Sequence, residues 1–463
     1  PRSVPTWPAA LATAPCTHTV TANLQAALNA VRAGDVLCLS GTFVGQFTLP
    51  PRSDTGWVVV RSQASVTPPG QRVRPSLAGP LARLATNLGG GAPTLKAAPG
   101  ARGWYLAELD ITIDPAVTAI LSTIVDLPRG ASQLVLDRVY LHAGTGQQVQ
   151  RCLALNSAHT AVVHSWLDDC HAKGYDSQAI VSWASDGPVL LEDNTLAGAG
   201  ETVMLGGADP STPGVVPQDW TIRRNHIVTP IAWKGVWTKK NLFETKNARR
   251  ILVEANVLEG SWADGQIGYA FVLKTANQSG SCTWCTFNDA TIRQNLILRV
   301  AGVFGVTGKE GWNKNALDSL GRRVAILDNY ADSVNVAPYA GAAQLVALSN
   351  GLSDLTIAGN TILGSGLQND WMVQAPAPAI AAINLVFEGN LLMRGRYSLF
   401  GCGATITTCL TSPTITNNAF VGATFATIPG VVAVPSVAAG RALGAGIDRA
   451  TIDTIVRGVV VSP

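Results

Sequence analysis

The sequence is poor in charge and in aromatic residues. Asp, Glu, Lys and Arg make up 14% of its 463 residues and Phe, Trp and Tyr 6%, while the hydrophobic residues reach 47%. The net charge of +3 is small and evenly spread, and no nucleic-acid-binding motif is present, so we expect no nucleic-acid partner. A hydrophobic content carried mostly by Ala, Val, Leu and Ile favours a long, thin core over a globular aromatic one.

The sequence also lacks a run of about 18 apolar residues, so we expect no membrane span. It begins with Pro-Arg-Ser-Val-Pro and not with a basic segment followed by an apolar one. This start predicts a mature, secreted protein whose signal peptide has been removed. We expect a monomer.

Cysteine is scarce, but its eight residues lie in close pairs. The pairs are Cys16 with Cys38, Cys152 with Cys170, Cys282 with Cys285, and Cys402 with Cys409. Four local disulfides in an oxidising compartment are the first interpretation. Cys282 and Cys285 also fit half a zinc site or a redox pair, although no second CxxC or His pair accompanies them.

One motif recurs along the chain: an apolar alternating strand, then Asn, any residue, and an aliphatic residue. The clear copies place Asn at 194, 225, 256, 295, 329, 360, 390 and 418, which gives spacings of 31, 31, 39, 34, 31, 30 and 28 residues. Looser copies centre on Asp110, Asp137 and His164. A period near 30 with alternating strands predicts a β-solenoid. A β-sandwich, the alternative, predicts turns every 8–12 residues or so.

The geometry of stacked coils gives the Asn a role. We expect each Asn to occupy a left-handed corner and to hydrogen-bond the Asn of the next coil. The aliphatic residue two positions later is then expected to point into the core. Residues 22–32 carry a helical apolar face and predict an N-terminal capping helix, and residues 447–455 predict a short C-terminal helix.

These coils, the N-terminal helix and the segment GDVLCLSGTFVGQFTL at 34–49 resemble the right-handed parallel β-helix proteins, which include pectate lyases, chondroitinase B, alginate lyases and polygalacturonases. Four further segments resemble a group of secreted bacterial β-helix proteins: DSQAIVSW, GETVMLGGADP, NLFETKNARRILVEANVLEG and WADGQIGYAFVLK. The resemblance implies an all-β, single-stranded right-handed parallel β-helix at 51–425, with an N-terminal cap at 1–50 and a C-terminal cap or tail at 426–463. This scaffold hosts several reactions, so it does not set the chemistry.

Charge gathers in residues 233–274, and alignment of the strands brings this segment together with residues 176–209 on neighbouring coils. The long spacings after Asn256 and Asn295 predict loops that wall a cleft here. The predicted catalytic residues are Lys246, Lys274, Glu244, Glu201 and Asp264. The predicted substrate-binding residues are Lys240, Asp176, Gln178, Arg249, Trp237, Trp262, Gln266 and Asp209. Trp237 and Trp262 are expected to be exposed platforms on which sugars stack.

The first hypothesis is a polysaccharide lyase acting on a uronic acid glycan. β-Elimination needs a cation to neutralise the sugar carboxylate and a base to remove the C5 proton. The resemblance to chondroitinase B and alginate lyases implies Lys246 as the base and Lys274 or Lys240 as the cation. Lys274 replaces an Arg of that family's Arg-His-Gly segment and is followed by Thr-Ala-Asn. Repulsion from Lys240, Arg249 and Arg250 is expected to lower the pKa of Lys246.

Two other hypotheses remain open. The first is a glycoside hydrolase that uses a pair of carboxylates in the same groove; its candidates are Asp176, Glu201, Asp209, Glu244 and Asp264. The second is a non-catalytic glycan-binding or surface β-helix, in which the charges form structural ion pairs. No metal site is assigned, although Glu201, Glu244 and Asp264 offer ligands for Ca²⁺ that would bind a substrate carboxylate.

Overall fold

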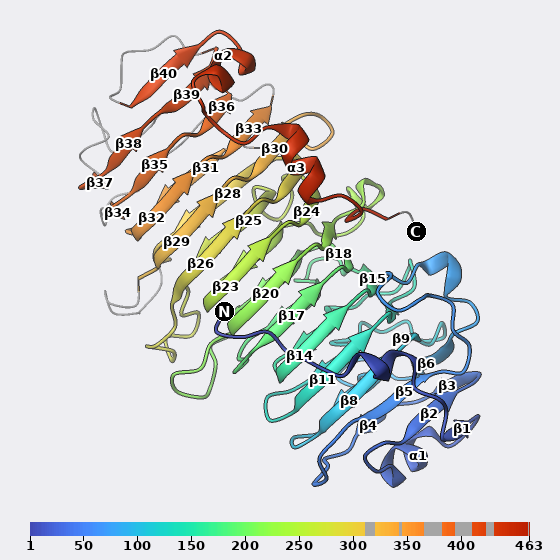
Figure 1. The fold of residues 1–463 in the computed structure, drawn as a ribbon. Coiled ribbons are helices and arrows are strands. Elements are labelled where there is room, and N and C mark those ends of the chain that lie inside the picture. The colour runs from blue at the N-terminus through green and yellow to red at the C-terminus, as the bar shows by residue number, and fades with distance from the viewer. Residues whose placement is uncertain (311–319, 342–344, 365–381, 394–409, 423–429, 462) are drawn as a thin grey trace.

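The computed structural model describes residues 1–463 apart from 311–319, 342–344, 365–381, 394–409, 423–429 and 462. The described strands stack in three parallel sheets that run along the molecule (Figure 1). The chain visits sheets A, B and C in turn and then begins the next coil, so each strand pairs with its equivalents one coil before and after. The fold is a right-handed parallel β-helix, as the sequence predicts.

The three sheets contain the following strands. Sheet A contains β1 (His18–Val20), β2 (Val36–Leu39), β5 (Val58–Ser62), β8 (Arg102–Ala107), β11 (Ser132–Asp137), β14 (Ala158–Val163), β17 (Val189–Glu192), β20 (Gln218–Arg223), β23 (Ala248–Glu254), β26 (Phe287–Arg293), β29 (Arg322–Leu327), β32 (Ser353–Ala358), β34 (Ala382–Ile383), β35 (Val386–Glu388), β37 (Leu410–Thr411) and β38 (Thr414–Thr416). Sheet B contains β3 (Thr42–Val44), β6 (Ala82–Thr86), β9 (Leu109–Ile113), β12 (Tyr140–His142), β15 (Trp166–Cys170), β18 (Thr195–Gly198), β21 (His226–Val228), β24 (Val257–Ser261), β27 (Leu296–Val300), β30 (Tyr330–Val334), β33 (Thr361–Gly364), β36 (Leu391–Met393), β39 (Asn418–Val421) and β40 (Val431–Val434). Sheet C contains β4 (Phe47–Leu49), β7 (Leu95–Ala97), β10 (Val125–Leu127), β13 (Arg151–Leu155), β16 (Gln178–Ser182), β19 (Glu201–Leu205), β22 (Asn241–Thr245), β25 (Tyr269–Lys274), β28 (Gly302–Thr307) and β31 (Val346–Ser349).

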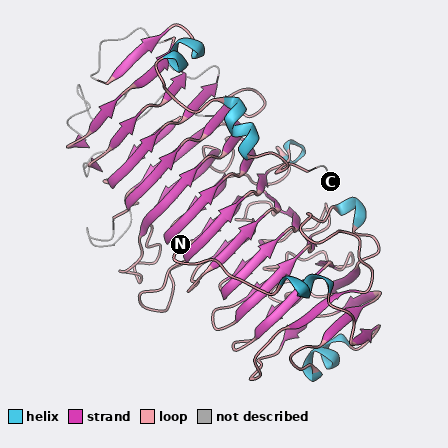
Figure 2. Cartoon of the chain, viewed as in Figure 1, coloured by secondary structure: helices cyan, strands magenta, loops and turns pink. Residues whose placement is uncertain are grey.

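Helices are short and lie outside the strand stack (Figure 2). They are η1 (Ala9–Thr13), α1 (Leu24–Ala30), η2 (Pro75–Leu77), η3 (Ile231–Trp233), α2 (Val437–Ala442) and α3 (Arg449–Ile455). The predicted N-terminal helix is present as α1, which buries Leu24 and Leu28; its capping role stays a prediction. The predicted C-terminal helix is present as α3, which is capped by Asp448. None of the described helices is long and apolar enough to cross a membrane.

The predicted Asn ladder runs between sheets A and B. Each Asn side chain from Asn194 to Asn390 donates through Nδ2 to Oδ1 of the Asn one coil on, at 2.9–3.1 Å. The same Oδ1 accepts the backbone N–H of the previous Asn, which satisfies a polar group buried at the corner. The aliphatic residues two positions later, such as Leu196 and Ile227, are buried in the core as predicted.

Two details of the ladder differ from the sequence analysis. The left-handed residue is not the Asn but the residue before it, for example Asp193 (φ 55°) and Ala255 (φ 54°), because the Asn already begins the next strand direction. The looser copies were also placed one or two positions off, because the ladder positions are Leu109, Val139 and Ser165 and not Asp110, Asp137 and His164. In the sheet register Tyr140 pairs with Asp110 and with Trp166, and Ser165 precedes Trp166, so Ser165 holds the place of the ladder Asn.

Three of the four expected disulfides are present: Cys16–Cys38, Cys152–Cys170 and Cys282–Cys285. The third pair is therefore a disulfide and not half a zinc site. Cys402 and Cys409 lie outside the described residues.

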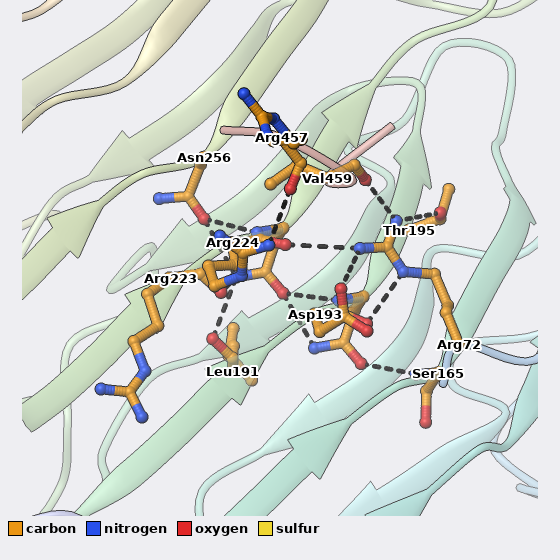
Figure 3. Close-up of polar contacts among 12 residues, drawn as sticks. Arg72, Ser165, Leu191, Asp193, Thr195, Arg223, Arg224, Asn256, Arg457 and Val459 are labelled. Carbon is orange, nitrogen blue, oxygen red and sulfur yellow. Dashed lines mark hydrogen bonds and ion pairs between the residues drawn. The ribbon is translucent and has the colours of Figure 1, made fainter. Parts of the chain in front are cut away.

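The C-terminal segment lies back across the β-helix and is held by two arginines, which we call the C-terminal clamp (Figure 3). Arg72 donates to the Val459 carbonyl at 2.7 Å, and also to Thr195, Asp193 and the Arg224 carbonyl. Arg224 donates to the carbonyls of Ile455 and Arg457. All five N–H groups of Arg72 are thus used in a side chain that is 1% exposed.

Candidate functional site

Sheet C carries in-register files of side chains, and one file per strand position runs along the helix axis. The end file contains the residues that directly follow β16, β19 and β22 and the last residues of β25, β28 and β31. It consists of Trp183, Gly206, Lys246, Lys274, Thr307 and Ser349. The start file consists of Arg151, Gln178, Glu201, Asn241 and Tyr269. Successive members of a file are about 4.8 Å apart, so the strand register gathers residues that are far apart in sequence.

A central file, which contains Met204, Glu244 and Val272, lies between the start file and the end file and faces away from the core. Phe243, Phe271 and Phe304 stack inside the helix at centroid distances of 5.5 and 5.4 Å. Glu244, the neighbour of Phe243, therefore points to the opposite face, in register with Met204 and Val272. This outer face is the floor of the candidate site.

Lys240 joins two carboxylates at one side of the site. Its ammonium contacts Asp176 and lies 3.3 Å from Oε1 of Glu201, whose other oxygen accepts from Gln178 at 2.8 Å. Glu201 is fully buried, and burial, together with the charges of Glu244 and Asp176, raises its pKa. Burial lowers the pKa of Lys240, but Glu201 and Asp176 outweigh it and raise that pKa above its ordinary value.

Glu244 joins two further lysines. Its Oε1 lies 3.2 Å from Lys274 and 3.9 Å from Lys246, and its Oε2 accepts from Asn241 at 2.8 Å. Lys274 also pairs with Glu310 at 2.8 Å. Burial opposes the charge of Lys274, yet Glu244 and Glu310 raise its pKa well above the ordinary value, so Lys274 stays an ammonium. Asn241 also donates to Gln266, which brings this predicted residue into the same network.

Lys239 is a buried residue that the sequence analysis did not assign to the site. It is fully buried, and burial lowers its pKa to about 7 even though Glu201 acts in the opposite direction. Its ammonium donates to the Asn241 carbonyl at 2.7 Å. The lysine whose pKa is depressed is therefore this one. Its position two residues before the strand that carries Glu244 was the available signal.

Arg249 and Arg250 lie away from this cluster, which corrects the expected repulsion on Lys246. Both sit on β23 of sheet A, where Arg249 donates to Gln218 and to the Gly214 carbonyl, and Arg250 pairs with Asp219 at 2.8 Å. The corner after Lys246 turns the chain out of sheet C, so these arginines face another side of the helix. The prediction that Arg249 binds substrate finds no support in this placement.

The two predicted tryptophan platforms differ. Trp262 is 1% exposed, so the expectation of an exposed platform is wrong there. Trp237 is half-buried and stacks on His171 with centroids 4.1 Å apart, while Trp233 meets the edge of the same His. These contacts anchor the loop that precedes Lys239 and Lys240.

Asp264 and Asp209 hold loops in place. Asp264 is exposed and accepts from the backbone N–H of Lys239 at 2.9 Å, while Asp209 accepts from the backbone N–H groups of Gln278, Ser279 and Ser281. In the described part of the chain, no three His, Cys, Asp or Glu side chains gather in a way that would hold a metal. Glu201, Glu244 and Asp264 thus do not form the Ca²⁺ ligand set suggested by the sequence.

Two cavities flank Lys246 along the helix axis. One, of about 360 Å³, is lined by Lys274, Tyr269, Gly305 and Glu310 among others. The other, of about 610 Å³, lies toward the N-terminus and has Trp183, Asn156 and Asp209 in its wall. Lys246 therefore lies on a coil between the two cavities, and Lys274 lines one of them.

No protein-family model matches the chain, and no curated protein matches it in sequence. Solved structures do match it. A mannuronic acid-specific polysaccharide family 6 lyase from human gut microbiota has a TM-score of 0.51 at 12% identity, over 96% of this chain and 98% of that one. The catalytic domain of a GH87 alpha-1,3-glucanase has a TM-score of 0.51 at 9% identity, over 90% and 70%. These similarities show the parallel β-helix fold.

Identities this low establish the fold alone. Other β-helix structures are longer than this chain, which spans 66% of the Dettilon tailspike protein (TM-score 0.42, 15% identity, over 91% of this chain) and 59% of the alginate lyase AlyGC. The reaction must be argued from the side chains of the candidate site.

Proposed function

We propose that the protein is a polysaccharide lyase that cleaves an acidic, uronic acid-containing glycan by β-elimination. The observation that carries the proposal is the row of lysines over buried glutamates on sheet C. The side chains of Lys240, Lys246 and Lys274 are 20%, 14% and 13% exposed, whereas Glu201 and Glu244 are 0% exposed. A ligand on this surface meets cations first, and the glutamates act from beneath by orienting them.

The three lysines differ in how closely they are paired, and this difference suggests their roles. Lys240 contacts Asp176 directly and Lys274 lies 2.8 Å from Glu310, while the nearest carboxylate oxygen to Lys246 is 3.9 Å away. An ammonium held between close carboxylates keeps its proton, so Lys240 and Lys274 suit neutralisation of the sugar carboxylate. Because Lys246 is the least closely paired of the three, we assign it the role of base.

In this reaction Lys246 takes the C5 proton while the substrate carboxylate faces Lys274. The electrons form the C4–C5 double bond, and the C4–O bond breaks. The proton on Lys246 is then available to the departing oxygen, so atoms and charge balance. The similarity to a mannuronic acid-specific lyase makes mannuronate the first acidic sugar to test.

Glycoside hydrolysis is the second candidate, because the raised pKa of Glu201 suits a general acid. Its weakness is access. Both Glu201 and Glu244 are fully buried, and the acid and nucleophile of a hydrolase must contact the sugar. The similarity to a GH87 glucanase keeps the hypothesis open to test.

We also propose that the protein is secreted after removal of a signal peptide and acts as a monomer. Support for secretion comes from the three disulfides among the described residues, since disulfides persist in oxidising compartments.

The test is a screen of the protein against acidic and neutral polysaccharides, in which reducing ends and the ultraviolet absorbance of unsaturated uronate are followed together. The proposal expects both signals on an acidic glycan. Reducing ends without absorbance would mean that the protein is a glycoside hydrolase and that the carboxylates carry out the reaction. Silence on all glycans, combined with binding, would leave a binding protein.

A further inference from the structure

A tryptophan stands in the same file as the two central lysines. Trp183 directly follows β16, as Lys246 follows β22, and the strand register places them two coils apart in one row. Two strand spacings separate them by about 10 Å. Trp183 was quoted in the sequence analysis only as part of a resemblance and had no role.

The position between them is a glycine, and the backbone there requires one. Gly206 has φ +93°, and a Cβ on it would lie 2.6 Å from the backbone nitrogen of Asn247 and 3.0 Å from Cβ of Lys246. The row therefore consists of an aromatic ring, a glycine and two cations, and the glycine lets the chain at Lys246 and Asn247 approach closely.

The ring of Trp183 is held in place from two sides. The Arg151 guanidinium lies 5.4 Å from the ring centroid, and Met204 belongs to the same apolar cluster. A Cβ on Gly207 would meet Met204 at 2.8 Å, so this second glycine lets Met204 lie against the tryptophan. Asn156 accepts from the backbone N–H of Trp183 at 2.8 Å and fixes its chain position. Such support pre-organises an aromatic surface.

The half-buried Trp183 side chain also forms part of the wall of the cavity of about 610 Å³. Arg129, Asp186 and Asp209 add polar groups to that wall, and Arg129 pairs with Asp186 at 2.8 Å. A concave site with an aromatic surface and a few polar groups suits a sugar ring, which has an apolar face and hydroxyl edges.

We propose that the Trp183 cavity is a sugar-binding subsite that holds the glycan on the N-terminal side of Lys246. The inference rests on the proposed function, since it places the same glycan chain along the end file. The chain then extends from the Trp183 cavity past Lys246 to the cavity at Lys274. It follows that long oligosaccharides bind more tightly than short ones, and that contact with Trp183 supplies the additional affinity.

The test compares affinities in a Lys246→Ala background, which prevents turnover. The probes are a dimer and a hexamer of the acidic glycan that the screen identifies, beginning with mannuronate, and binding is measured by calorimetry. Trp183→Ala is expected to weaken hexamer binding on the order of tenfold and to leave dimer binding at the lysines nearly unchanged. Trp183→Phe keeps a ring and is expected to restore most of the loss.

The matched control is Trp57→Ala, because Trp57 is also half-buried but packs against the apolar cluster on sheet A. Thermal unfolding of each variant checks that it is folded. Equal hexamer affinity in Trp183→Ala and its parent would overturn the subsite and leave the lyase proposal standing. If the unmutated protein binds no acidic glycan of the panel, the proposed function fails and the subsite fails with it.

Discussion

The C-terminal clamp and the sheet C site both place cations among carboxylates across several coils, and both lie beside a cavity. They differ in how completely the charges are satisfied. In the clamp, Arg72 uses all five donors. In the sheet C site, Oε1 of Glu201 and of Glu244 lie within ion-pair distance of lysines but accept no hydrogen bond from the residues that the structure describes.

This difference separates charge that holds the fold from charge that is available to a ligand. A buried guanidinium with every donor occupied has nothing left to offer a substrate. Partly exposed ammoniums above partly satisfied carboxylates keep donors from which a bound anion can accept. Perturbed groups of this kind gather at functional sites more often than elsewhere.

The largest expected effect is on activity, at Lys246. Lys246→Ala should lower kcat by about a hundredfold or more, because no other proposed group is placed to take the proton. Lys246→Arg should be nearly as inactive, since a guanidinium keeps its charge at working pH. The rate of unsaturated product formation measures both.

Lys96→Ala is the control for Lys246, because Lys96 is an exposed lysine on strand β7 of the same sheet. It should keep normal activity. Full activity in Lys246→Ala would remove Lys246 from the mechanism and return attention to the carboxylates.

The next largest effect is on stability, at the clamp. Arg72→Ala should lower the free energy of unfolding by about 3 kcal/mol, because it leaves Asp193 and the Val459 carbonyl without their buried partner. Activity per folded molecule should not change. Urea unfolding and initial rates, measured on the same samples, test both halves of the comparison.

Arg323→Ala is the control for Arg72, since its ion pair with Asp289 is half-exposed and should contribute less than about 1 kcal/mol. A loss of activity in Arg72→Ala would show that the clamp and the sheet C site are coupled. The distinction between charge that holds the fold and charge that is available to a ligand would then be wrong.

Lys239 tests directly what it costs in stability to bury a charge in the sheet C site. Its pKa is about 7 in the folded protein and 10.5 for an ordinary lysine, so between these values the unfolded chain binds more protons and stability rises with pH. Below about pH 7 both states are protonated and the penalty is constant. Lys239→Met should therefore raise the free energy of unfolding at neutral pH by about 2 kcal/mol, after allowance for the lost bond to the Asn241 carbonyl.

The gain from Lys239→Met should shrink as the pH rises toward 10.5, above which the native lysine is neutral in both states. Urea unfolding at several pH values measures it. A destabilised variant, or a gain that does not depend on pH, would mean that Lys239 is not held partly deprotonated.

The fold could be predicted from the sequence because the motif that determines it recurs in successive coils. The Asn ladder and the buried aliphatic positions recur every coil, and each copy reports the same environment. The left-handed residue was misplaced because Asp, Ala, Gln and Gly all fill the position before the Asn, so it has no residue signature.

The site was predicted in part, because its residues do not repeat. Lys246 and Lys274 were found by alignment of strand ends, and the same alignment extended one residue beyond Ser182 would have reached Trp183. The burial of Trp262 and the turn that carries Arg249 out of sheet C depend on where each corner falls. A period of about 30 residues does not fix a corner to a single residue.

The smallest expected effect is at Glu310, where the charge of Lys274 is shared with a partly exposed carboxylate. Glu310→Gln keeps the side chain's size and removes its charge, so Lys274 is paired with Glu244 alone and meets an incoming carboxylate with less competition. We expect acidic oligosaccharides to bind about threefold more tightly, which is within the range of a partly exposed ion pair. Calorimetry at two salt concentrations measures this gain, which should be smaller at high salt.

Glu254→Gln is the control, because Glu254 pairs with Arg293 on sheet A in a similar geometry and should leave affinity unchanged. Weaker binding in Glu310→Gln would mean that Glu310 positions Lys274 for the ligand and does not compete with the ligand's carboxylate. Of the two carboxylates paired with Lys274, Glu244 alone would then distinguish the sheet C site from the fully satisfied clamp.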